Sequence, residues 1–302
     1  MSTASSGKVG VVLMTYGSAT TAEHVEEYFE HIYQGKVSAT LIKDFENRYR
    51  AVGRSPLIEI TKKQAALLEQ QLGEGYVVRA GMRHSAPFIS EAVAECRAEG
   101  AVNLVGIILS PQFSSFIMEG YKRSFTDAAQ AQGFSEKHIA VAEPWPTEPH
   151  LIEFIATQIS KSPVRPVIFT THSLPRRVVE KDPSYLGQLE ATINAVIEKL
   201  DKKLEWYAAY QSAGHTLEEW LKPDLVDVLT KLHRNKTQTA LIMPIQFLAD
   251  HLEILYDLDI AAHKQCEERG IAYHRTELPN TDPLFINALA SIAKSAQLKK
   301  LD

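Results

Sequence analysis

In two stretches of the sequence, a mostly apolar run is followed by side chains that could do acid–base or metal chemistry. The first is the run 167–171, which is followed by His172 and then by Ser-Leu-Pro. The second follows the apolar run 241–245 and carries Glu253 and Asp257. An imidazole, with an ordinary pKa of about 6.5, can take up protons near neutral pH. Imidazole and carboxylate together, without cysteine, suit a weakly held Fe²⁺, Co²⁺ or Zn²⁺.

Both stretches should lie where a parallel sheet binds its ligands. Apolar and β-branched residues before a polar tip are typical of a buried parallel strand, and ligands bind outside the carboxyl ends of such strands. We therefore expect His172 and Glu253 to approach each other across one pocket, from opposite lobes, over a flat ligand. A lone histidine is otherwise a satisfied core residue, and a helical glutamate is otherwise a solvated surface residue. The apolar neighbours of Glu253, with Asp257 one turn on, favour a path for a cation or a proton instead.

The other predicted strand ends are aromatic and polar rather than highly charged. Such a crevice suits a large, flat, apolar ligand more than a phosphate. Neither G-x-G-x-x-G nor G-x-x-x-x-G-K occurs in the chain, so the usual nucleotide-binding loops are absent. A weak metal site beside a flat pocket matches metal insertion into a tetrapyrrole, in which two pyrrole protons must leave as the metal enters.

Composition narrows the class of protein. At 302 residues, with 45% hydrophobic and 23% charged residues, the chain is expected to form two ordinary globular domains. The net charge of −5 gives no basic field for nucleic acid. Two cysteines, Cys96 and Cys266, are too few for a disulfide framework or a four-Cys cluster. No secretory signal or membrane span is apparent, which predicts a soluble, cytoplasmic protein without stable membrane insertion.

Strand and helix signals alternate along the chain, which predicts an α/β fold with parallel sheets. We predict two doubly wound, Rossmann-like domains, 8–147 and 148–282, each with about four strands and with the active-site cleft between them. The C-terminal helix 283–302 is expected to pack back on the first domain. Strands are predicted at 9–14, 76–80, 102–109, 139–142, 167–171, 204–210, 239–245 and 272–274. Helices are predicted at 22–32, 41–49, from Ser55 (the cap) and Pro56 onward, 87–99, 119–132, 151–160, 185–200, 223–232, 251–269 and 283–298.

Several segments together resemble the ferrochelatases over most of the chain, from about Val9 to Pro283. The segments that carry the resemblance are Thr-His-Ser-Leu-Pro at 171–175, Tyr-Gln-Ser at 210–212, Trp-Leu-Lys-Pro at 220–223, the acidic segment 247–257, Ser-Pro-Leu at 55–57 and Ser-Pro-Gln-Phe-Ser at 110–114. Met-Thr-Tyr-Gly at 14–17 is similar to the branch that acts on coproporphyrin III. The chain departs from the family pattern at Ser18-Ala19, Tyr33-Gln34, Arg83, Ala213 and Ala261.

The resemblance implies a role for each matching residue. His172 would be the catalytic base that contacts the metal, and Glu253 would be the facing catalytic and metal-binding carboxylate. Asp257 would continue a secondary acidic path. The substrate would be bound by Tyr16, Arg83, His84, Ser55, Gln112, Tyr121, Ser212 and Trp220, with Tyr16 at the open face of the metal.

The sequence thus predicts an enzyme that inserts ferrous iron, a substrate metal, into coproporphyrin III and needs no redox cofactor. We expect a monomer whose partners are the porphyrin and Fe²⁺, with a transient acceptor for the product. The alternatives are a chelatase for protoporphyrin IX or for cobalt or nickel, a non-catalytic porphyrin or haem carrier, and a bilobed solute-binding protein. The presence of both His172 and Glu253 counts against the carrier, and the missing export signal counts against the solute-binding protein.

Overall fold

The computed structural model describes residues 7–112, 114–200, 203–214 and 216–298. The chain divides into two compact units. The first unit combines the chain up to Leu109 with Phe116–Trp145 and the chain from Asn280, and the second combines Ser110–Ser115 with Pro146–Pro279. Among the described residues, no helix is long and apolar enough to cross a membrane.

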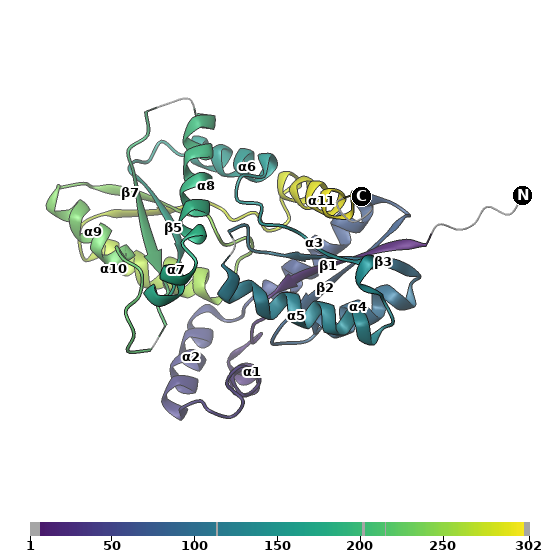
Figure 1. Ribbon diagram of the computed structural model, residues 1–302. Helices are drawn as coiled ribbons and strands as arrows, with labels where there is room; N and C mark the ends of the chain where they lie inside the picture. Colours follow the sequence, from purple (N-terminus) through teal and green to yellow (C-terminus); the bar gives the residue numbers. More distant parts are fainter. Residues whose placement is uncertain (1–6, 113, 201–202, 215, 299–302) are drawn as a thin grey trace, which may run out of the picture. The chain divides into compact units, whose positions relative to one another are not determined.

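The first unit is built on a four-stranded parallel sheet in the order β2-β1-β3-β4. Figure 1 labels β1, β2 and β3 of this sheet. Strand β1, one of the two central strands, is buried except at its first residue, which explains the continuous apolar run in the sequence. Helix α11 packs against α3 and β3 of this unit. The strands are β1 (Lys8–Thr15), β2 (Tyr76–Met82), β3 (Ala101–Ile108) and β4 (Ile139–Val141). The helices are η1 (Ala22–His24), α1 (Val25–Tyr33), α2 (Ala39–Val52), α3 (Leu57–Leu72), α4 (Ile89–Ala98), α5 (Ser115–Ala131), η2 (Glu136–His138) and α11 (Pro283–Leu298).

The second unit repeats this plan with the parallel order β6-β5-β7-β8. Strand β5 lies between β6 and β7, so the residues that follow β5 and β7 emerge side by side at one edge of the sheet. The strands are β5 (Val167–His172), β6 (Trp206–Gln211), β7 (Thr239–Pro244) and β8 (Ala272–Arg275). The helices are α6 (Pro149–Lys161), α7 (Arg176–Lys181), α8 (Ser184–Leu200), α9 (Leu225–Arg234), the π-helix η3 (Glu253–Ala262) and α10 (His263–Glu267).

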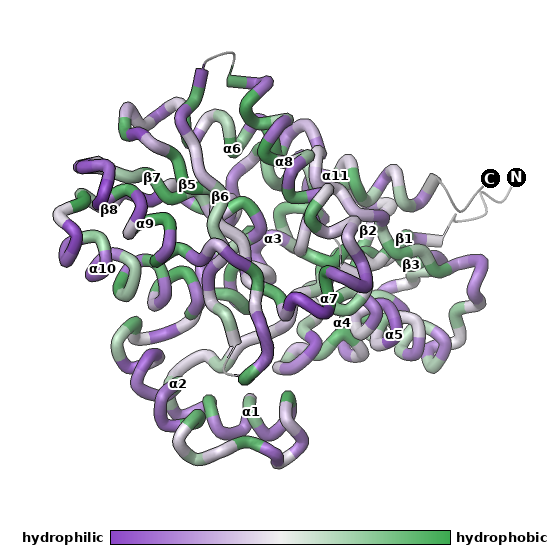
Figure 2. The backbone as a smooth tube through the Cα atoms, turned by 60° about the vertical axis from the view of Figure 1, so that its left-hand side comes forward, coloured by the Kyte–Doolittle hydropathy of each residue, from purple (hydrophilic) through white to green (hydrophobic). Residues whose placement is uncertain are grey.

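The pattern of hydrophobic residues explains why the predicted elements form. Figure 2 shows strands such as β7 as mainly hydrophobic, whereas helices such as α1 and α2 alternate between hydrophobic and hydrophilic residues along their length. In the second unit, α9 and η3 contribute their apolar faces to one core with β7. All eight predicted strands are present, and the predicted fold class of two four-stranded parallel α/β sheets is confirmed.

Three local predictions were wrong. Ser55 does not cap α3: the helix begins at Leu57 with Pro56 at the N-cap, and the Ser55 side chain is buried with no hydrogen-bond partner for its hydroxyl. Helix α7, which begins directly after Pro175, was not predicted, although proline is well suited to a helix start. The predicted helix 251–269 has π-type hydrogen bonding from Glu253 to Ala262, which hydrophobic periodicity cannot distinguish from an α-helix.

Candidate functional site

The structure brings His172 and Glu253 together within the second unit. His172 is the last residue of β5, and Glu253 is the first residue of η3, which follows β7. The Nε2 atom of His172 lies 3.6 Å from Oε2 of Glu253. The expectation that the two come from opposite lobes was wrong, because β5 and β7 are neighbours in one sheet.

Hydrogen bonds fix the position and the tautomer of His172. Its backbone N–H donates to Oε1 of Gln246 (3.0 Å), and the amide of Gln246 donates in turn to the hydroxyl of Tyr185 (3.0 Å). The Nδ1 atom lies 2.5 Å from the carbonyl oxygen of Ser173. Because a carbonyl can only accept, Nδ1 carries the proton, which leaves the lone pair of a neutral ring on Nε2. That lone pair is on the nitrogen nearest Glu253.

Oε2 of Glu253 lies close to this ring but makes no hydrogen bond. The side chain is 36% exposed, but its Oε2 atom is buried. A carboxylate oxygen and an imidazole lone pair are both acceptors, so their approach favours a proton or a cation between them. Among the residues that the structure describes, no group of three or more His, Cys, Asp or Glu side chains could hold a metal ion. Two donors alone do not make the four-ligand set of a closed structural metal site.

A second acidic side chain continues from this pair along the π-helix. Asp257 lies one turn after Glu253 and accepts a hydrogen bond from the hydroxyl of Ser212. Ser212 follows β6 and has a left-handed backbone (φ +54°) that turns the chain there. His251 binds the carbonyl of Ala249 through Nδ1.

Comparison with known proteins assigns the family. The ferrochelatase family model matches residues 8–297. The chain belongs to the ferrochelatase family. It is therefore an enzyme of the lyase class that forms metal–nitrogen bonds in porphyrins, as the sequence resemblance predicted.

Relatives of known name support the same assignment. A protein of Geobacillus kaustophilus named coproporphyrin III ferrochelatase is 36% identical over 300 residues, with 94% of each chain covered. One of the same name from Bacillus subtilis is 34% identical over 312 residues, covering 97% of this chain and 98% of its own. Two solved chelatases share the fold: the sirohydrochlorin chelatase SirB with cobalt (TM-score 0.60, 12% identity, 96% of each chain) and CbiX (TM-score 0.52, 14% identity, 96% of this chain and 99% of the other).

In this ferrochelatase, two further predicted site residues belong to the second unit. Trp220 pairs with Pro175 in an isolated bridge, so its loop lies along the segment that follows His172. Its indole N–H is buried without a hydrogen-bond partner, which leaves one donor available to a ligand. Gln112 is 1% exposed and donates to Thr192 of α8 (2.9 Å), so its amide nitrogen is already used within the unit.

The other predicted residues belong to the first unit, and Ser55 is the buried one already described. The Tyr16 and His84 rings lie 4.5 Å apart, and the backbone N–H of His84 donates to the carbonyl of Tyr16. The guanidinium of Arg83 lies 5.7 Å from the centre of the Tyr121 ring, and burial of this side chain raises the pKa of its hydroxyl. Burial, then the charges of Arg83 and His31, lower the pKa of His84 to about 4. Sequence reasoning did not identify the contact of His31 with His84, because a histidine on an amphipathic helix is usually an exposed surface residue.

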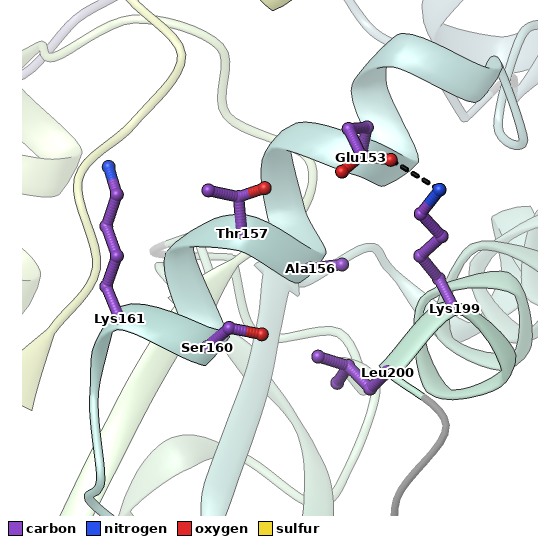
Figure 3. Close-up of a pocket in the computed structure, with 7 residues that line it drawn as sticks. All are labelled: Glu153, Ala156, Thr157, Ser160, Lys161, Lys199 and Leu200. Carbon is purple, nitrogen blue, oxygen red and sulfur yellow. Dashed lines mark ion pairs between the residues drawn. The ribbon is translucent and has the colours of Figure 1, made fainter.

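A separate hollow of about 350 Å³ lies between α6 and α8 of the second unit (Figure 3). It is lined at the C-terminal ends of both helices, and an ion pair joins Lys199 to Glu153 across it. Each of these helices leads into a strand, so the hollow lies at the edge where the strands begin. His172 lies at the opposite edge of the sheet, where β5 ends. The hollow is therefore not part of the candidate site. It is lined by Glu153, Ala156, Thr157, Ser160, Lys161, Lys199 and Leu200.

Proposed function

We propose that this ferrochelatase inserts Fe²⁺ into coproporphyrin III to give Fe-coproporphyrin in haem biosynthesis. The observation that carries the proposal is the pairing of Nε2 of His172, whose ring is positioned by the contact of Nδ1 with the Ser173 carbonyl, with Glu253 at 3.6 Å. Relatives with 33–36% identity over nearly the whole chain bear the name coproporphyrin III ferrochelatase, which supports the choice of porphyrin.

The reaction requires proton removal at the nitrogens that receive the metal. Two N–H bonds of the porphyrin break, two Fe–N bonds form in addition to two dative ones, and two protons leave. Nε2 of His172 has the free lone pair and is the acceptor for each proton in turn. The imidazolium that forms is stabilised by the charge of Glu253, which can then pass the proton toward Asp257 and solvent.

The same two side chains can contact the incoming iron. An imidazole nitrogen and a carboxylate oxygen are borderline and hard donors that Fe²⁺ accepts. With only two protein ligands the metal is held weakly, as its release into the porphyrin requires. Iron enters and leaves as Fe²⁺, so we propose that no redox cofactor takes part.

The remaining assignments are part of this proposal. Tyr16, Arg83, His84, Ser55, Gln112, Tyr121, Ser212 and Trp220 are proposed to bind the porphyrin. We further propose that the enzyme acts as a monomer and passes its product to a transient acceptor, which sizing with and without product would test.

The direct test is an anaerobic assay of porphyrin absorbance. Purified protein is mixed with Fe²⁺ and either coproporphyrin III or protoporphyrin IX, and parallel reactions contain Co²⁺, Ni²⁺ or Zn²⁺. We expect the highest kcat/KM for Fe²⁺ with coproporphyrin III. A preference for another pair would replace the proposed substrate, and tight product binding without turnover would identify a carrier.

The role of His172 has its own test. The variant His172→Ala should lose iron insertion, about 10²-fold or more in kcat for the loss of a general base. The same variant should still quench its tryptophan fluorescence on binding coproporphyrin III. Turnover at the wild-type rate in this variant would contradict the assignment.

A further inference from the structure

A pair of histidines in the first unit has no part in the proposed proton transfer: His31 has no proposed role, and His84 is proposed only to bind the porphyrin. His31 comes from α1, and His84 comes from the turn after β2, 53 residues later in the chain. Their Nδ1 atoms lie 3.2 Å apart, and this contact is exposed to solvent. Two nitrogens that bind one tetrahedral Zn²⁺ at about 2.0–2.1 Å are separated by about 3.3 Å. The two Nδ1 atoms therefore already stand at the spacing of two metal ligands.

Aromatic packing holds both rings in place before any ligand arrives. His31 stacks on Phe88, with ring centres 5.1 Å apart and planes 29° apart. His84 packs against Tyr16 at 4.5 Å, and the two histidine rings meet edge to face at 5.3 Å. The backbone of His84 is fixed by its hydrogen bond to the carbonyl of Tyr16. A pre-positioned ring loses little side-chain entropy when it binds a metal.

We propose that His31 and His84 form a second, open site for a borderline divalent metal ion such as Zn²⁺ or Co²⁺, with solvent completing the coordination. Both ligands are imidazoles, which suit these ions, and the donor set contains no carboxylate. The site is separate from the His172–Glu253 pair in sequence and in structural unit.

The protons of the pair can be accounted for without a further base. Without metal, one neutral ring donates its Nδ1–H to the Nδ1 lone pair of the other. Metal binding needs both lone pairs, so the donor ring loses its Nδ1 proton and gains one at Nε2. No net proton leaves the pair.

The test is metal binding in a protein that lacks the proposed insertion site. A variant with His172→Ala and Glu253→Gln serves as the background, and Zn²⁺ alone is titrated by calorimetry. Co²⁺ is titrated in parallel by its visible absorbance. We expect one bound ion in this background, so the result is independent of whether the proposed catalytic roles are correct.

Ring-preserving variants then assign the ligands. His31→Phe and His84→Phe, each in the background, keep the aromatic packing and remove one nitrogen donor. Each should weaken Zn²⁺ binding by about tenfold or more, because loss even of a residue that only supports a ligand costs 10–100-fold. His24→Ala is the matched control, since His24 is exposed near the start of α1 and contacts Thr21 instead.

Three results would overturn the proposal. One is a background protein that binds no Zn²⁺ or Co²⁺. Another is a loss of binding in only one of the two Phe variants, which would indicate a single adventitious histidine. The third is an equal loss in His24→Ala. Melting temperatures of all variants, measured without metal, show whether each one is folded.

Discussion

Replacement of Glu253 by Gln is the sharpest test of the proposed reaction, because it removes a charge and little else. At 3.6 Å, the carboxylate and an imidazolium attract each other by about 1 kcal/mol in water and about 4–5 kcal/mol at an effective dielectric constant of 20. Each side chain is about one-third exposed (33% and 36%), so solvent screening favours the lower part of this range. We take about 1–3 kcal/mol as the loss.

This loss falls on the protonated state of His172, and hence on the chemical step. A tenfold change in rate corresponds to about 1.4 kcal/mol, so Glu253→Gln should lower kcat about 5- to 150-fold. The new amide can also donate to Nε2 of His172 and occupy its lone pair, which acts in the same direction. Porphyrin binding, followed by tryptophan quenching, should change little.

The chain supplies a matched control for this experiment. His263 and Glu267 also form a histidine–glutamate contact, at 3.7 Å, but these side chains are 50% and 70% exposed. Glu267→Gln should leave the anaerobic insertion rate within about twofold, since exposed pairs contribute only about 0–1 kcal/mol. The reasoning is refuted if Glu253→Gln retains the wild-type kcat, or if both variants lose the same amount.

Two further variants test how the pair is positioned. Gln246→Leu should lower the free energy of unfolding in urea by about 2–4 kcal/mol, because the backbone N–H of His172 and the hydroxyl of Tyr185 each lose a hydrogen-bond partner. It should also lower kcat, and a stable variant with normal kcat would contradict this role. Arg275→Met should cost about 2–3 kcal/mol in urea, because Asp259 loses a two-point ion pair (2.7 and 2.8 Å). Adding Asp259→Asn should recover part of that loss, and equal stabilities of the single and double variants would contradict the coupling.

Much of the fold could be predicted because each strand has its own local signal. Runs such as 167–171 and 241–245 consist almost entirely of apolar and β-branched residues, as is typical of strands covered on both faces. The order of strands within a sheet has no such signal, since it depends on which edge each crossover takes. The predicted domain 148–282 contains both His172 and Glu253, so assigning them to opposite lobes was inconsistent with it. That they lie at neighbouring strand ends is seen only in the pairing of β5 with β7.

The features that sequence reasoning missed depend on tertiary contacts. His31 lies on a helix with two exposed glutamates in its first turn, so the sequence around it is typical of a solvent-exposed helix face. Only the packing of α1 beside the turn after β2 reveals its contact with His84. The π-helix is hidden for a similar reason, because wide helical turns depend on packing rather than on a residue period.

The π-helix also shows how one segment can hold several carboxylates with different tasks. Arg275, at the end of β8, forms a fork on Asp259 and lies 3.8 Å from Asp250, while the Tyr273 hydroxyl also donates to Asp259. Arg275 thus pairs with these two aspartates, and its contact with Asp259 holds the helix against the sheet. Glu253 faces an imidazole instead of a guanidinium, so it can respond to a proton or a metal ion. A permanent cation at that position would neutralise the carboxylate and remove the reason for a cation to enter.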